Sequence, residues 1–219
     1  MAIKKNTTEV LEIRPIEIKK VNLRIVGDTP LIMHAWSEKA KRMMLEAQMG
    51  LAKGKKKDPK NPVEDFIRSM YWLTNMPEEM TEEAFNEAIS SGARFGFPVT
   101  AFKQAAISAA YRMGWAKDKV SLRGAFFIDS DENGMIEIHS DVPKMREDMV
   151  KVGMGTADIR YRGEFANWYA DMTISYNMNG NYSLENIMNI INAGGYVCGV
   201  GEWRPEKDGQ YGMFHVTNS

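Results

Sequence analysis

Basic and aromatic side chains are interleaved along the chain, mostly in its second half. Cations neutralise phosphates and aromatic rings stack on bases, so this combination is typical of proteins that bind single-stranded nucleic acid. Gly199 and Gly201 belong with them, because glycine amides can approach a sugar–phosphate chain closely or form anion-holding nests. The other candidate contacts are Lys103, Arg112, Arg123, Arg160, Arg162, Arg204, Trp36 and Trp203, and Lys117 and Lys119 extend the same positive run.

A lysine-rich segment precedes this region. Lys55, Lys56 and Lys57 lie in a stretch that contains Gly54 and Pro59 and lacks apolar residues, which predicts a solvated loop rather than a helix. Such a loop can serve solubility alone, or it can contact phosphate groups. We include the three lysines among the candidate nucleic-acid contacts.

These features also have structural interpretations. Trp168 belongs to the core by its position in an alternating strand. Arg160 or Arg162 can instead pair across strands with an acid such as Asp171. The binding hypothesis therefore rests on the combined arrangement rather than on any single residue.

Signals for catalysis or metal binding are weaker. His34, His139 and His215 are far apart in the chain, and none forms a local metal-ligand spacing with another histidine or with the single cysteine. Cys198 lies in the apolar run 196–200 and is expected to be a buried, inert thiol. His34 is the one candidate for a general acid or base, against the simpler interpretation of a packed histidine. We expect no metal and no cofactor, and the sequence favours a role without catalysis while leaving His34 as an open alternative.

The composition is that of an ordinary globular chain. Its 219 residues carry 28 basic and 29 acidic side chains, so any charged surface must be local. One cysteine excludes an internal disulfide framework, and no apolar run is long enough to span a membrane, which favours a cytoplasmic protein without a membrane partner. Residues 1–14 are polar and are expected to form a flexible arm. The 17 methionines fit either core packing or an adaptable contact surface.

Alternation and capping residues predict the regular elements. Val21, Leu23 and Ile25 alternate with polar residues in a strand over 16–26, and the clearest alternation is over 168–177. Helices are expected over 38–51, 63–73, 82–90 and 101–113, and from Ser183 to Gly194. Further strands are expected over 125–128 and 135–139, which form a hairpin, and over 158–162 and 213–216.

This order predicts an α+β fold with a ferredoxin-like antiparallel sheet, built on a βαββαβ unit with helices on one face. The core domain comprises residues 15–36 and 95–219 in this interpretation. Residues 37–94 form a helical insertion after the first strand.

Three segments also carry a likeness to a known family. They are the strand 21–26 with the following Thr29 and Pro30, the segment 97–103 that leads into an alanine-rich helix, and the glycine-rich stretch 194–212. Together they resemble the RAMP superfamily, the ferredoxin-like RNA-binding proteins of CRISPR effector complexes, and especially its repeating backbone subunit. A compact stand-alone protein of this kind could equally be encoded by a phage.

The resemblance implies a head-to-tail oligomer or ribonucleoprotein subunit in which each copy covers a few nucleotides. It implies that the insertion projects as a thumb-like element, with the lysines of 53–60 touching nucleic acid or a neighbouring copy. The chain departs from the family in this helical insertion, and it has no clear equivalent of the aspartate that cuts RNA in some backbone subunits.

The leading hypothesis is a non-catalytic protein that binds single-stranded RNA or DNA and oligomerises along the strand. One alternative is a viral or structural protein-interaction module whose methionine-rich helices dock a partner. The other is a metal-independent endoribonuclease that uses His34, as in the processing members of the superfamily.

Overall fold

The computed structural model describes residues 14–36, 38–51, 59–152 and 155–217. Lys55, Lys56 and Lys57 and most of the predicted N-terminal arm lie outside these residues. Within them the chain forms nine β-strands, whose pairings are all antiparallel, and six α-helices. The predicted α+β class is confirmed.

A four-stranded sheet forms one half of the molecule, in the order β4-β8-β1-β9. Its strands are β1 (Ile18–Gly27), β4 (Phe126–Ile128), β8 (Tyr169–Asn177) and β9 (Phe214–Thr217). The pairing of β1 with β8 runs without interruption from Ile18 opposite Asn177 to Val26 opposite Tyr169. Alternation decides which face is buried, since Leu23 and Ile25 of β1 point into the core.

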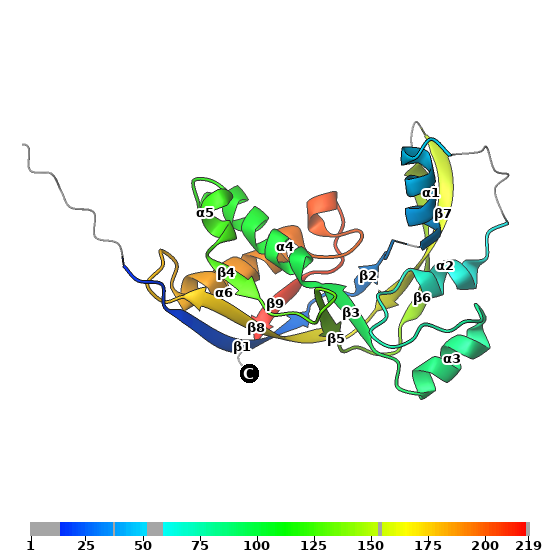
Figure 1. The fold of residues 1–219 in the computed structure, drawn as a ribbon, viewed down its shortest axis with the longest axis horizontal. Coiled ribbons are helices and arrows are strands. Elements are labelled where there is room, and N and C mark those ends of the chain that lie inside the picture. The colour runs from blue at the N-terminus through cyan, green and yellow to red at the C-terminus, as the bar shows by residue number, and fades with distance from the viewer. Residues whose placement is uncertain (1–13, 37, 52–58, 153–154, 218–219) are drawn as a thin grey trace, which may run out of the picture.

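Three helices cover one face of this sheet (Figure 1). They are α4 (Val99–Arg112), α5 (Val120–Arg123) and α6 (Leu184–Ala193). In the chain, α4 lies between β1 and β4, and α6 lies between β8 and β9. Ser183 caps α6 with a full capping box, which explains why this helix begins where the sequence predicts.

Small residues bring α4 and the end of α6 into close contact. A Cβ atom on Gly194 would lie 2.7 Å from the backbone of Ala106, so the alanine stripe of α4 faces this glycine. After Gly194 the chain continues as a single π-helical turn, η1 (Gly194–Cys198). The apolar run 196–200 thus begins in this turn, and the Cys198 thiol is fully buried as predicted.

A long hairpin dominates the other half of the molecule. It consists of β6 (Lys144–Val152) and β7 (Thr156–Phe165), and β2 (Leu31–Met33) pairs with the base of β7. The helices α1 (Glu38–Gln48), α2 (Pro62–Arg68) and α3 (Glu82–Ser90) lie at this end, away from α5 and α6 (Figure 1). They come from the predicted insertion 37–94, and Phe66, Ile67 and Phe85 join α2 and α3 to the main hydrophobic core.

The predicted hairpin between 125–128 and 135–139 is wrong. Strand β4 pairs with β8, whereas β5 (Met135–Ile138) pairs with β3 (Phe95–Pro98) in a separate two-stranded sheet. The local turn is present, since the Gly134 amide donates to the Asp131 carbonyl. The two strands that flank the turn nevertheless find partners that are distant in sequence.

Two features are absent from the described residues. No helix there combines the length and apolar character that crossing a bilayer requires. The same residues contain no group of three histidine, cysteine or acidic side chains arranged to hold a metal ion.

Candidate nucleic-acid interface

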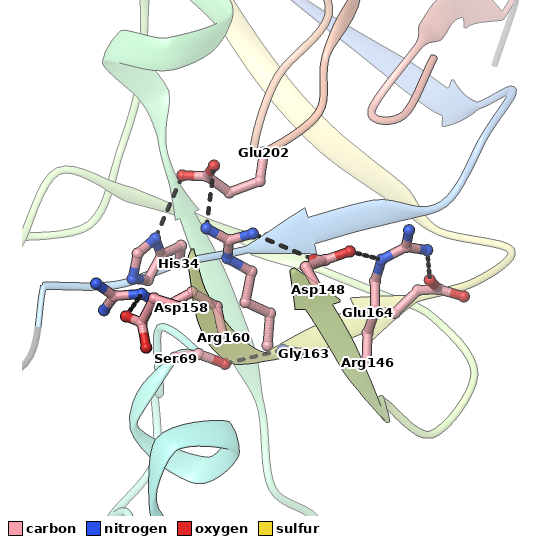
Figure 2. A network of polar contacts seen from close by, with 10 residues as sticks. His34, Ser69, Arg146, Asp148, Asp158, Arg160, Gly163, Glu164 and Glu202 are labelled. Atoms are coloured by element: carbon pink, nitrogen blue, oxygen red, sulfur yellow. Dashed lines mark hydrogen bonds and ion pairs between the residues drawn. The ribbon is translucent and has the colours of Figure 1, made fainter. Parts of the chain in front are cut away.

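Charged side chains line one face of the β6–β7 hairpin near its base (Figure 2). Arg146 on β6 lies directly opposite Arg162 on β7, and two like charges in this position repel each other. Asp148 removes the conflict because its two carboxylate oxygens accept from both guanidinium groups, at 2.8 Å from Arg146 Nε and 3.1 Å from Arg162 Nη1. Arg146 also donates to Glu164 Oε2 at 2.8 Å.

Arg162 is the most deeply buried cation of this network, with a side chain only 6% exposed. Its second terminal nitrogen lies 3.5 Å from Glu202 Oε2, and its Nε atom is buried without a hydrogen-bond partner. A buried guanidinium held by two carboxylates is neutralised and is not accessible to a phosphate. Arg162 therefore has a structural role, joining β7 to Asp148 on β6 and to Glu202 in the glycine-rich stretch.

Glu202 joins the glycine-rich stretch to the hairpin. Its amide donates to the Ile32 carbonyl at 3.0 Å, and its carboxylate lies 3.4 Å from His34 Nδ1 as well as close to Arg162. The structure thus brings together three of the predicted features, His34, Arg162 and the glycine-rich stretch. Figure 2 shows His34 and Glu202 pointing toward each other. The contact from His34, opposed by burial and assisted by the charge of Arg162, lowers the pKa of Glu202 below its usual range.

This lowered pKa predicts how the stability of the protein depends on pH. The stabilisation from ionised Glu202 is complete above about pH 4.5, the ordinary pKa of a glutamate, and is lost as the pH falls through the lower pKa of the folded state. We expect Glu202→Gln to remove part of the fall in unfolding free energy between about pH 6 and about pH 3, measured by urea denaturation. Glu185→Gln removes an exposed carboxylate without an ion pair in the described residues and should keep the wild-type slope. Equal slopes for all three proteins would contradict this.

The candidate glycines serve internal packing. Gly199 and Gly201 have φ angles of 64° and 79°, which residues other than glycine rarely adopt. A Cβ on Gly199 would meet Pro205, and one on Gly201 would lie 2.5 Å from the Ile32 carbonyl oxygen. The Gly199 amide already donates to the Gly194 carbonyl, so it is not free to bind an anion.

Most of the other candidate cations have partners. Arg160 pairs with Asp158 at 3.0 Å, and Arg112 and Arg204 share Glu206 at 2.8 and 3.2 Å. The ammonium group of Lys103 lies 3.8 Å from the centre of the Phe127 ring, and burial lowers the pKa of Lys103. Arg123 differs from these residues, because it is exposed and forms no ion pair within the described part of the chain.

The two candidate tryptophans are both accessible to solvent, but they differ in exposure and in backbone conformation. Trp36 follows β2 and is 62% exposed. Trp203 is 36% exposed and has a positive φ of 53°, which the tight turn of the glycine-rich stretch imposes. Its carbonyl accepts a hydrogen bond from the Tyr211 amide, so the backbone here is fixed from within.

A second surface was only partly foreseen from the sequence. It follows the end of α4 and continues through α5, and we call it the α4–α5 rim, defined by Tyr111, Trp115, Lys117, Lys119 and Arg123. Tyr111 and Trp115 are each about half exposed, and Lys119 Nζ lies 5.6 Å from the centre of the Tyr111 ring. Lys117, like Arg123, is exposed without an ion pair among the described residues.

The signal for this rim was present in the sequence. Lys117, Lys119 and Arg123 are opposed by only one acid, Asp118, whose carboxylate accepts a hydrogen bond from the Ser121 amide at 2.8 Å. The aromatic residues were missed because Tyr111 and Trp115 occupy a helix end, where a large side chain usually packs inward.

Comparisons with known proteins give no family for this chain. A scan against models of protein families found no match, and a search of curated proteins found none either.

Proposed function

We propose that this protein binds single-stranded nucleic acid, RNA or DNA, without cleaving it, and that the α4–α5 rim is the contact surface. The observation that carries the proposal is the mixture of exposed rings and unpaired cations on the rim. Tyr111 and Trp115 offer faces for stacking, and Lys117 and Arg123 are cations without an acid partner among the described residues.

The pairing of the charges argues against the β6–β7 hairpin as the main contact surface. Arg146 and Arg162 carry their charge into a network that already contains Asp148, Glu164 and Glu202. A phosphate there would have to displace a carboxylate from a guanidinium, and it would gain little net attraction. In this proposal the hairpin arginines and Arg204 position the glycine-rich stretch, and Arg123 keeps the role that the sequence suggests for it.

We also propose that the core is ferredoxin-like and that copies associate along the strand, as the resemblance to the RAMP superfamily implies. Support for the fold comes from the strand order β4-β8-β1-β9 together with the positions of α4 and α6. Strand β8 lies between β1 and β4, β9 lies on the other side of β1, and both helices cover one face, which is consistent with the proposed βαββαβ unit.

Fluorescence anisotropy with labelled RNA and DNA strands tests the contact surface. We expect the double variant Lys117→Ala/Arg123→Ala to bind about tenfold or more weakly at low salt. The slope of log affinity against log salt should fall by about 1.4, because each phosphate of a single strand that is no longer neutralised means about 0.7 fewer counterions released on binding. The matched control is Lys20→Ala/Arg24→Ala, which removes the same charge from residues already paired with Asp129 and Asp171.

Two outcomes would contradict the proposal. Equal losses in both double variants would mean that only overall charge matters. No binding of the wild-type protein at low salt would reject nucleic acid as the ligand. It would favour the protein-interaction module instead. The apolar surface of α1 supports that alternative, because Met43, Met44 and Leu45 are all about half exposed.

A further inference from the structure

An open pocket of about 750 Å³ adjoins the α4–α5 rim. It lies where the end of α4 meets α6 and η1, and Trp115 belongs both to the rim and to the pocket wall. We call it the asparagine pocket, and its lining includes Asn181, Asn186, Asn189, Trp115, Tyr182 and Tyr196. Its volume lies within the range of about 300–1,000 Å³ that is usual for small-ligand sites.

The lining suits a neutral, flat ligand with polar edges, because Met113, Ile190, Ala193 and Val197 supply apolar surface beside the asparagines. None of the side chains that line it is an acid, a lysine or an arginine. The rings of Trp115, Tyr182 and Tyr196 offer stacking faces, and the side-chain amides of Asn181 and Asn189 each offer both a donor and an acceptor. The side chains of Asn181 and Asn189 are exposed and form no hydrogen bond within the described residues, so both side-chain amides are free to bind a ligand.

Hydrogen bonds fix the two other asparagines of the lining, Asn186 and Asn192. Asn186 Oδ1 belongs to the capping box of α6, and Asn192 Oδ1 accepts from the Val216 amide at 2.6 Å. These bonds anchor the wall to the start of the helix and to β9. The π-helical turn η1 then changes the direction in which side chains leave the helix, and Tyr196 on this turn is 73% exposed beside the pocket.

We propose that the asparagine pocket binds an unpaired nucleobase of the strand that crosses the α4–α5 rim. This inference rests on the proposed function and names the part of the ligand that this pocket takes. A base is flat and neutral, its edge carries amide-like donors and acceptors, and asparagine pairs with such edges. Lys117 follows Trp115 by two residues and supplies the cation for the attached phosphate.

The position of Lys117 is the reason for choosing a base over a sugar. Aromatic and amide groups alone would also suit a saccharide, which carries no phosphate. Here the stacking ring of Trp115 is followed by exposed, unpaired Lys117 and then by Lys119, so an anionic backbone can leave the pocket along a positive path.

The test uses the full-length protein and an oligouridine strand of about 20 nucleotides that carries 5-iodouridine. We expect ultraviolet cross-links at Trp115, Tyr182 or Tyr196, located by mass spectrometry of the digested complex. We expect Tyr196→Ala to weaken strand binding by about fivefold to 150-fold and to leave the salt slope unchanged, since stacking is lost without loss of charge.

A second variant separates hydrogen bonding from stacking. Asn189→Leu keeps the size of the side chain and should weaken binding about tenfold, whereas Asn75→Leu, at an exposed asparagine outside the pocket, should not. Each residue is exposed, so the variants are expected to fold normally, and circular dichroism checks this.

The results distinguish this inference from the proposed function. The pocket inference would be overturned if strand binding depended on Lys117 and Arg123 but not on Tyr196 or Asn189, and if the cross-links lay elsewhere. The proposed function would still stand in that case. Binding of a simple saccharide that is lost in Asn189→Leu would also overturn it. No strand binding by the wild-type protein would reject both.

Discussion

Replacing Asp148 by alanine should lower the free energy of unfolding by about 3–5 kcal/mol. Asp148 is 7% exposed and is the only carboxylate of the network that contacts both Arg146 and Arg162. Its removal leaves two guanidinium groups directly opposite each other in the β6–β7 register without the charge that separates them. Arg162 suffers most, because its Nε atom is already without a partner.

The comparison with an exposed pair makes this prediction specific. Asp171 accepts two hydrogen bonds of 2.7 Å from Arg24, a geometry at least as good as that of Asp148, but both side chains are solvent-exposed. Asp171→Ala should therefore have a far smaller effect, since water screens the pair and solvates the remaining arginine. Urea denaturation of both variants measures the difference.

A compensating variant shows whether uncompensated charge is the cause. Asp148→Ala combined with Arg162→Met should be more stable than Asp148→Ala alone, because no guanidinium is then left buried with only Glu202 at 3.5 Å. An effect of Asp148→Ala no larger than that of Asp171→Ala would show that the network contributes little to stability.

The sequence was sufficient to predict those elements in which the hydrophobic pattern and the buried face agree. In β8, Ala170, Met172 and Ile174 are buried in alternation, and in α6 the capping residue Ser183 and the apolar stripe point to the same helix. Burial of Trp168 follows from the same alternation. Local rules of propensity, capping and period therefore describe β1, β8, α4 and α6 well, but not the pairing of β4 or the presence of α5.

Strand β6 could not be predicted in this way because its pattern is inverted. Met149 is 77% exposed, whereas its neighbour Asp148 is buried in the ion-pair network. Hydrophobic periodicity would assign the methionine to the core and the carboxylate to solvent. Asp148 is buried because the fold brings Arg162 and Glu202, from other parts of the chain, into the same ion-pair network.

The same limit applies to the candidate site. Arg162 meets Asp148 from 14 positions away, and Arg112 meets Glu206 from 94 positions away. No spacing rule relates such residues, so cations that look available in the sequence are neutralised in the fold. Lys117 and Arg123 lie in a short segment with a single acid, and there the local charge balance was a sound guide.

Replacing Gly195 by alanine should lower the free energy of unfolding by about 3 kcal/mol, at the upper end of the effects of overpacking. Gly195 is buried in η1, and a Cβ atom there would lie 1.8 Å from the carbonyl oxygen of Phe214 on β9. The obstacle is backbone, so it cannot rotate away as a flexible side chain would. Strand β9 would have to move, and the Phe214 ring would lose its contacts with Phe102 and Trp168.

Gly124→Ala provides the matched control for this prediction. Neither glycine has a positive φ, so the two variants differ in space and not in backbone strain, and a Cβ on Gly124 would meet nothing within 4 Å. Gly124→Ala should therefore change the unfolding free energy by no more than about 0.5 kcal/mol. Because η1 also carries Tyr196 to the asparagine pocket, Gly195→Ala should weaken strand binding as well, at a temperature where the variant is still folded. Equal stability of the two alanine variants in chemical denaturation would contradict the close packing of η1 against β9 on which both effects depend.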